Sequence, residues 1–208
     1  MNDLLTTLGF LDAKWVLLAL LLCSIIATAI IVERLLFGPT KEKLFPTEYQ
    51  KELKRLLQLR KYDELVGVSR SSKSSLARFS LRALELRNRS KSELKEALLS
   101  FGDRELVRLQ KNLSALSTIA SVSPLLGLLG TVVGMIKTFA VIQASGSPDS
   151  AVLAGGISEA LLTTAAGLTI AIPCLLFHRY FTTKLKRLLA DLDSIVFDVV
   201  ELIYQGEE

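Results

Sequence analysis

Long apolar runs alternate with charged stretches along this chain of 208 residues. Three runs, at 15–32, 113–143 and 151–177, contain only two charged residues, Lys137 and Glu159. A helix rises about 1.5 Å per residue and a hydrocarbon core is about 30 Å thick, so the first run, of about 18 residues, is near the minimum for crossing a bilayer. The pattern therefore predicts three transmembrane helices.

Leucine spacing outside these runs also predicts helices. In the charged middle segment, 33–112, leucines recur at helical spacing, with a break at Ser69–Ser75. A stripe from Leu94 to Leu116 runs into the second apolar run, and another from Leu185 to Ile203 continues the third. We therefore predict an all-α polytopic membrane protein whose second and third transmembrane helices extend into a cytoplasmic helical bundle.

Basic residues are concentrated in two of the segments that flank the runs. Most Lys and Arg lie at 33–112, and four more lie in the tail, 178–208. Because cytoplasmic loops are enriched in Lys and Arg, we expect both segments in the cytoplasm, with the amino terminus, 1–14, and the turn at 144–150 outside. The net charge of +4 reflects this sorting, and no aromatic and basic motif indicates nucleic-acid binding.

The first run has one feature of a cleaved signal peptide, since the Ala-Thr-Ala sequence at 27–29 resembles a cleavage site. The preceding segment, however, carries Asp3 and Asp12 with Lys14 as its only base, and the run continues past the small residues. A signal peptide has a basic leader and ends near its cleavage site. We therefore expect a retained transmembrane helix.

Glu159 is the only acid within the three runs. An ionised side chain in hydrocarbon costs several kcal/mol, so such a residue usually faces a bundle interior or a hydrated cavity and marks an ion pathway. Thr131 and Thr164 fall at similar depths near the middle of their runs, and Thr163 lies one turn from Glu159. Hydroxyls at these positions can hold water or orient a carboxylate.

Small residues spaced three or four apart form one face in each of the last two runs. Such faces allow close helix packing, which is also the plainest interpretation of the pattern. Pro124 and Pro173 each remove one backbone donor within these helices. The positions expected at the packed faces are Ser123, Gly127, Gly130, Gly134, Gly156 and Gly167.

Two sequences carry a resemblance to a known family: SPLLGLLGTVVGMIKTF from Ser123 and GGISEALLTTAAGLTIAIP from Gly155. Together they resemble the MotA, TolQ and ExbB proton channel family, and the layout of three spans looks most like the ExbB and TolQ branch. The resemblance places the proton pathway at Thr131, Glu159 and Thr164. The position before Thr164, often alanine in relatives, is Thr163 here, which leaves open which hydroxyl faces the pore.

The resemblance also implies partners and a location. It implies a pentamer in the bacterial inner membrane, with a periplasmic amino terminus and a cytoplasmic carboxyl terminus. This pentamer would surround the helices of a small ExbD- or TolR-like subunit, a single-span protein that supplies a membrane aspartate. Proton-motive force would then drive a TonB-like or a TolA-like protein, in outer-membrane transport or in Tol-Pal envelope maintenance. The sequence does not separate the ExbB role from the TolQ role.

Other functions are weighed against this one. An intramembrane hydrolase would need a base near its nucleophile, but Ser158 and His178 would lie about 30 Å apart on one helix, so we expect no enzyme. His178 is the only histidine and has no nearby cysteine set, so no metal or other cofactor is expected, and Cys23 and Cys174, in different runs, are expected as buried thiols without a bridge. The open alternative is a passive membrane scaffold, in which the small-residue stripes only pack helices.

Overall fold

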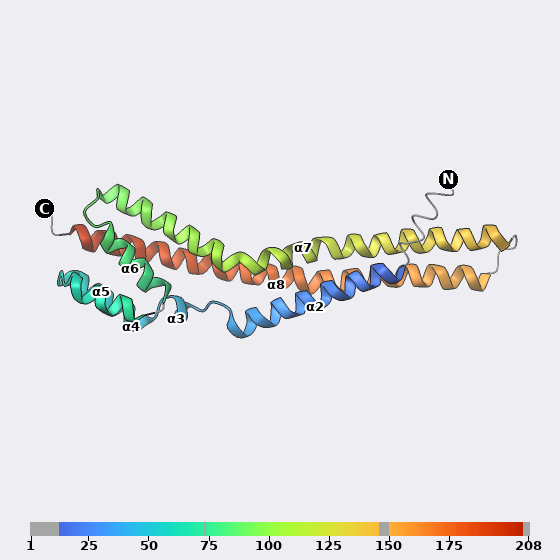
Figure 1. Ribbon diagram of the computed structural model, residues 1–208, viewed down its shortest axis with the longest axis horizontal. Coiled ribbons are helices and arrows are strands. Elements are labelled where there is room, and N and C mark those ends of the chain that lie inside the picture. The colour runs from blue at the N-terminus through green and yellow to red at the C-terminus, as the bar shows by residue number, and fades with distance from the viewer. Residues whose placement is uncertain (1–12, 73, 146–149, 206–208) are drawn as a thin grey trace. The chain divides into compact units, whose positions relative to one another are not determined.

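The computed structural model describes residues 13–72, 74–145 and 150–205, and every regular element over these residues is an α-helix (Figure 1). Three helices, α2 (Ala13–Phe37), α7 (Lys91–Ser145) and α8 (Ser150–Tyr204), are long and apolar enough to cross a membrane. The predicted all-α polytopic fold is thereby confirmed. Four shorter helices lie between α2 and α7: α3 (Lys41–Leu44), α4 (Thr47–Gln58), α5 (Tyr62–Ser71) and α6 (Ser75–Glu85).

The chain divides into two compact units. The first comprises Met1–Leu36 and Asn112–Tyr180, and the second comprises Phe37–Lys111 and Phe181–Glu208. Helices α7 and α8 each run for 55 residues without interruption and contribute to both units. The helices that hold the predicted spans therefore continue beyond 113–143 and 151–177, as the leucine stripes predicted.

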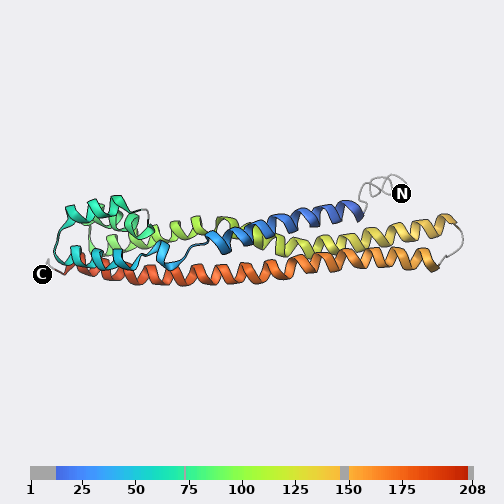
Figure 2. The ribbon, with the colours of Figure 1, turned by 90° about the horizontal axis from the view of Figure 1, so that it is seen from below.

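In the first unit, α2 packs beside the parts of α7 and α8 that belong to it (Figures 1 and 2). Its buried face includes Val16, Leu20 and Ala27, while the sole tryptophan, Trp15, is 60% exposed. The side-chain amide of Asn112 on α7 donates to both carboxylate oxygens of Glu33 on α2, at 3.0 and 3.3 Å. A large exposed apolar surface remains, which is the expected state of helices that face lipid.

In the second unit, α3 to α6 pack with the first part of α7 and the last part of α8 around a leucine-rich core (Figure 2). The rings of Phe79 and Phe101 lie 6.4 Å apart between their centroids. Ion pairs join Lys41 to Asp191 at 3.0 Å, and Lys54 to Asp198 at 2.6 Å. The fully buried side chains of this unit include Leu53, Leu57, Leu65, Leu76, Phe79, Leu94, Leu98, Val196 and Val199.

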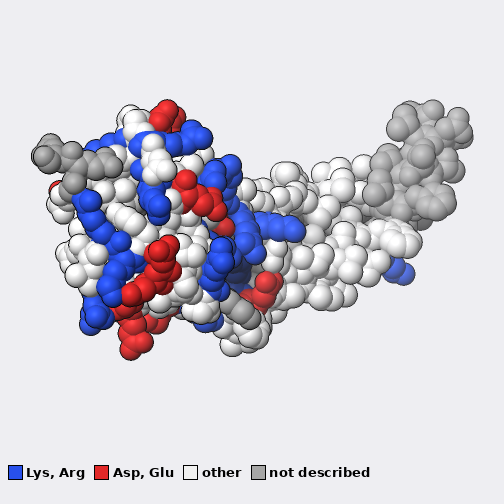
Figure 3. Space-filling model, turned by 60° about the vertical axis from the view of Figure 1, so that its left-hand side comes forward, with Lys and Arg blue, Asp and Glu red and all other residues white. Residues whose placement is uncertain are grey.

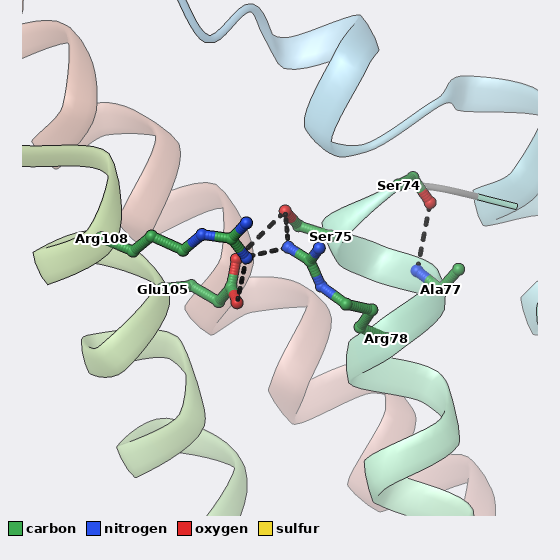
Figure 4. Close-up of polar contacts among 6 residues, drawn as sticks. All are labelled: Ser74, Ser75, Ala77, Arg78, Glu105 and Arg108. Carbon is green, nitrogen blue, oxygen red and sulfur yellow. Dashed lines mark hydrogen bonds and ion pairs between the residues drawn. The ribbon is translucent and has the colours of Figure 1, made fainter.

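A polar cluster joins α6 to α7 within the second unit (Figure 4). The carboxylate of Glu105 accepts from Arg78 at 2.6 Å and from the hydroxyl of Ser75 at 3.4 Å, and Arg108 approaches it at 3.9 Å. Ser74 caps the amino-terminal end of α6, and its hydroxyl accepts from the N–H of Ala77 at 3.1 Å. The Glu105 side chain is only 17% exposed, so these donors replace most of its water.

Local chemistry decides where several helices begin and end. After the last residue of α4, Arg60 lies at φ 54°. The N–H of Arg60 donates to the Leu57 carbonyl and that of Lys61 donates to the Leu56 carbonyl, which is the pair of hydrogen bonds of a Schellman motif. Helix α7 begins with a capping box: Glu93 accepts from the N–H of Ser90 at 3.0 Å, and Ser90 accepts from that of Glu93. The N–H of Ser90 thereby lowers the pKa of Glu93.

Candidate functional site

Helices α7 and α8 approach each other closely through glycines of the first unit. A methyl group added at Gly127 would lie 2.9 Å from the Thr163 carbonyl oxygen and 3.0 Å from the Thr164 Cα atom. One added at Gly134 would meet Ala160 at 3.0 Å, and one at Gly167 would meet the Ser123 carbonyl oxygen at 2.5 Å. At Gly127 and Gly167 the two backbones are therefore in contact, which leaves no room for a side chain there.

Thr163 lies inside this contact. Its side chain is fully buried, and a methyl group added at Gly130 would collide with it. The Thr163 hydroxyl is positioned to donate to the Ala160 carbonyl at 2.7 Å and to the Gly127 carbonyl at 3.1 Å. A hydroxyl has one proton and so serves one of these acceptors at a time. The geometry gives Thr163 a packing environment between the helices.

Thr164 lies at the edge of the same contact and is half-buried. Its hydroxyl donates to the Gly127 carbonyl at 3.1 Å. Thr131 follows Gly127 by one helical turn, is also half-buried, and donates to the Leu128 carbonyl of its own helix at 2.7 Å. The segment Gly127–Thr131 of α7 thus carries one of the three threonines and accepts hydrogen bonds from the other two.

Glu159 is exposed on α8, one turn before Thr163. Within the first unit, therefore, Thr163 and Thr164 meet at Gly127, whereas the carboxylate points away from the buried contact between α7 and α8. An ionised carboxylate on the surface of a membrane helix requires water or a polar partner.

The remaining packing positions also lie between the two helices. Ser123 is fully buried, and its hydroxyl has no hydrogen-bond partner among the residues that the structure describes. Gly156 faces the hydroxyl of Thr138, which donates to the Gly134 carbonyl at 2.9 Å. Thr138 and Ala160 belong to the same small-residue faces of the two runs, and the structure places Thr138 against Gly156 and Ala160 against Gly134.

The cysteines, possible metal ligands and charged side chains complete the description of candidate functional groups. Cys174 is buried, as predicted, whereas Cys23 is half-buried, and both are free thiols. Among the residues that the structure describes, no group of three His, Cys, Asp or Glu side chains could hold a metal ion. In the face shown in Figure 3, Lys, Arg, Asp and Glu gather on the second unit, while the described part of the first unit is largely uncharged.

Comparisons with known proteins agree with the resemblance in the sequence. A family model described as the MotA/TolQ/ExbB proton channel family matches residues 71–194. A putative biopolymer transport protein, ExbB-like 3 of Synechocystis sp., is 31% identical over 184 residues, which cover 88% of this chain and 87% of that protein.

Two further relatives match over shorter regions. ExbB-like 1 of the same organism is 40% identical over 134 residues, covering 63% of this chain and 52% of that protein. The biopolymer transport protein ExbB of Xanthomonas campestris pv. campestris is 34% identical over 118 residues, covering 56% of this chain and 47% of that protein. The chain therefore spans about half the length of these two relatives.

Proposed function

Because the chain belongs to the MotA/TolQ/ExbB proton channel family, we propose that it is the stator and channel subunit of an inner-membrane motor driven by proton-motive force. In this proposal, proton flow produces force on a periplasm-spanning protein of the TonB or TolA type. The work done is outer-membrane transport or envelope maintenance. The names of the similar proteins, biopolymer transport proteins of the ExbB type, favour transport.

The observation that carries the proposal is the position of Glu159. It is an exposed carboxylate on a helix that can cross a membrane, one turn from two threonines that contact the facing helix. In hydrocarbon this arrangement would cost several kcal/mol, so the acid needs a hydrated cavity. A ring of such subunits, each turning Glu159 inward, would provide one.

We propose Thr131, Glu159 and Thr164 as the residues that line the proton pathway. The half-buried positions of Thr131 and Thr164 support this assignment, because part of each side chain stays accessible from the surface of the helix pair. Thr163 is fully buried against Gly127 and Gly130, which favours a positioning role. The sequence left open whether Thr163 or Thr164 faces the pathway, and we therefore propose Thr164.

The proposed assembly is a pentamer of this chain around an ExbD- or TolR-like partner. The three apolar runs contain one acid and no aspartate, so a proton relay across the membrane needs a second carboxylate from another chain. Each proton that crosses 100 mV releases about 2.3 kcal/mol, so a few protons suffice to drive a step between two packed states. The amino terminus is then periplasmic and the carboxyl terminus cytoplasmic.

The alternative, a passive scaffold, has its own support in the glycine contact, since tight packing alone explains Gly127, Gly134 and Gly167. The two functions differ at Glu159. The test uses the complex isolated with its partner and reconstituted in liposomes, with an imposed potential and an internal pH dye. For Glu159→Gln, and for Thr131→Ala combined with Thr164→Ala, we expect proton flux to fall about tenfold or more while the complex still assembles.

A matched control is available two residues away. Leu161 is exposed on the same helix and cannot carry a proton, so Leu161→Ala is expected to leave flux unchanged. Full flux in the Glu159→Gln complex would favour the scaffold and overturn the channel assignment.

A further inference from the structure

A polar groove lies on the first unit, away from the glycine contact. It is lined by Ser114, Ser117, Thr118, Ser121 and Val122 of α7 and by His178 of α8. The hydroxyls recur at intervals of three, one and three residues, which places them on one face of the helix. His178 is the only histidine of the chain, and the pathway proposed above does not use it.

The hydrogen bonds of the groove give it a definite polarity. The hydroxyl of Thr118 donates to the Ser114 carbonyl at 3.0 Å, and that of Ser121 donates to the Ser117 carbonyl at 3.1 Å. Both protons are therefore directed into the helix, and the oxygen lone pairs are left to accept. These two hydroxyl oxygens can therefore accept hydrogen bonds from water or from a protonated group.

By regular helical spacing, the groove falls near the side of each helix that carries the proposed pathway. Ser117 precedes Thr131 by 14 residues, and His178 follows Thr164 by 14 residues. At 3.6 residues per turn, 14 residues return to within about 40° of the same face after a rise of about 21 Å. A pathway that follows these sides from Thr131 and Thr164 toward the cytoplasmic end therefore reaches the groove.

We propose that His178, with the hydroxyls of the groove, is the proton relay at the inner mouth of this pathway. The inference rests on the proposed function. One imidazole nitrogen binds a proton delivered by water from the span, and the other nitrogen releases its proton to water on the cytoplasmic side. The ring returns to the neutral state as the opposite tautomer, and a ring flip restores the first. Imidazole is the side chain suited to this exchange near neutral pH.

No other groove residue can titrate, because the rest of the lining consists of hydroxyls and one valine. The charged residues at this end of the first unit are Glu33 and Arg34 on α2 and Arg179 next to His178 on α8. Glu33 accepts from Asn112, two residues before the first groove hydroxyl. Replacing His178 therefore removes the imidazole of the groove and leaves these neighbours in place.

The experiment compares proton flux through the reconstituted complex for wild type, Glu159→Gln, His178→Ala and a control. Leu176→Ala is the control, since Leu176 is exposed on the same helix and does not line the groove. We expect His178→Ala to lower flux about tenfold or more. Added imidazole, which can occupy the vacated space and carry the proton, is expected to restore much of that flux. The control is expected to conduct as wild type does.

The outcomes separate the relay from the channel itself. If wild type conducts, Glu159→Gln does not, and His178→Ala conducts normally, the relay is wrong and the proposed function stands. A loss that imidazole does not restore in an assembled complex makes His178 structural and also overturns the relay. A wild-type complex that conducts no protons overturns both proposals.

A second variant covers the case in which His178→Ala does not assemble. His178→Gln keeps a polar side chain of similar size but has no nitrogen that titrates near neutral pH. A loss of about tenfold or more in this variant supports the relay, and normal flux overturns it.

Discussion

Gly102 shows how a single residue sets the packing of the second unit. It lies inside α7, where a methyl group would come within 3.0 Å of the Leu192 Cδ2 atom and 3.8 Å of the Leu189 Cδ1 atom. A small apolar cavity lined by Gly102, Phe101 and Leu192 lies beside it, so the end of the leucine has room to shift. Gly102 therefore lowers the helix propensity of α7, and no nearby backbone atom requires a glycine at this position.

We therefore predict that Gly102→Ala stabilises the protein. Alanine is favoured over glycine inside a helix by about 1 kcal/mol, and the displaced leucine methyl can enter the cavity. The midpoint of thermal unfolding in detergent should rise. Gly67→Ala is the reference, because nothing lies within 4 Å of a methyl group there and its gain reflects helix propensity alone. A fall in the midpoint for Gly102→Ala alone would show that Leu192 cannot move.

Arg60 is held in the left-handed region at φ 54° by the two hydrogen bonds that end α4. A residue with a Cβ atom pays about 1 kcal/mol in this conformation and glycine does not, so Arg60→Gly is predicted to raise the unfolding midpoint. Arg60→Ala keeps the Cβ atom and loses only the long side chain, which makes it the control. Equal effects of the two substitutions would contradict the explanation.

At the scale of elements, the contact between α7 and α8 depends on glycine at the crossing. Gly127→Ala would place a methyl group 2.9 Å from a backbone oxygen, which cannot move aside as a side chain can. We predict a loss of about 1–3 kcal/mol, seen as a lower unfolding midpoint. Gly155→Ala is expected to be tolerated, because a methyl group there meets nothing within 4 Å. Equal stability of the two variants would mean that the helices do not approach closely.

The same two helices carry a carboxylate pair in the second unit. Burial raises the pKa of Asp193, and repulsion from Asp103 raises it further. A carboxyl group with a raised pKa in the folded state costs nothing below its unfolded pKa, near 3.8, and destabilises the fold as the pH rises through the folded value. Asp193→Asn should therefore raise the unfolding midpoint at pH 7 and lose that advantage near pH 4.

The matched control for this pH dependence is Asp198→Asn, one turn or so further along α8. It removes the ion pair with Lys54 and is expected to give no stabilisation at pH 7. A gain for Asp193→Asn that persists unchanged at low pH would exclude ionisation as its cause.

The sequence predicted the elements, but it left open which of two neighbouring threonines is buried. Apolar run lengths and leucine spacing were enough for the three long helices and for the break at Ser69–Ser75, where α5 ends at Ser71 and α6 begins at Ser75. Thr163 and Thr164 are neighbours separated by about 100° on one helix, and only the facing helix decides which is buried. The groove was missed because its hydroxyls and His178 meet only when the register of α7 against α8 is known.

At the scale of the whole molecule, conduction is predicted to need more than this chain. The three apolar runs hold one acid, Glu159, and it is exposed on α8. In liposomes that contain this subunit alone, we predict proton flux far below that of the complex with its single-span partner, because the second carboxylate of the relay is missing. Robust flux from the subunit alone would contradict this division of labour between the chains.

Fluorescence of Trp15 can report on the environment of the first unit. Trp15 is the only indole in the chain and lies exposed near the beginning of α2. Intrinsic emission excited at the red edge of protein absorbance therefore reports on one place, without any introduced label. Quenching by lipids brominated at different acyl carbons would give the depth of that end of α2 in a bilayer, and a change on adding the partner chain would show that this surface had been covered.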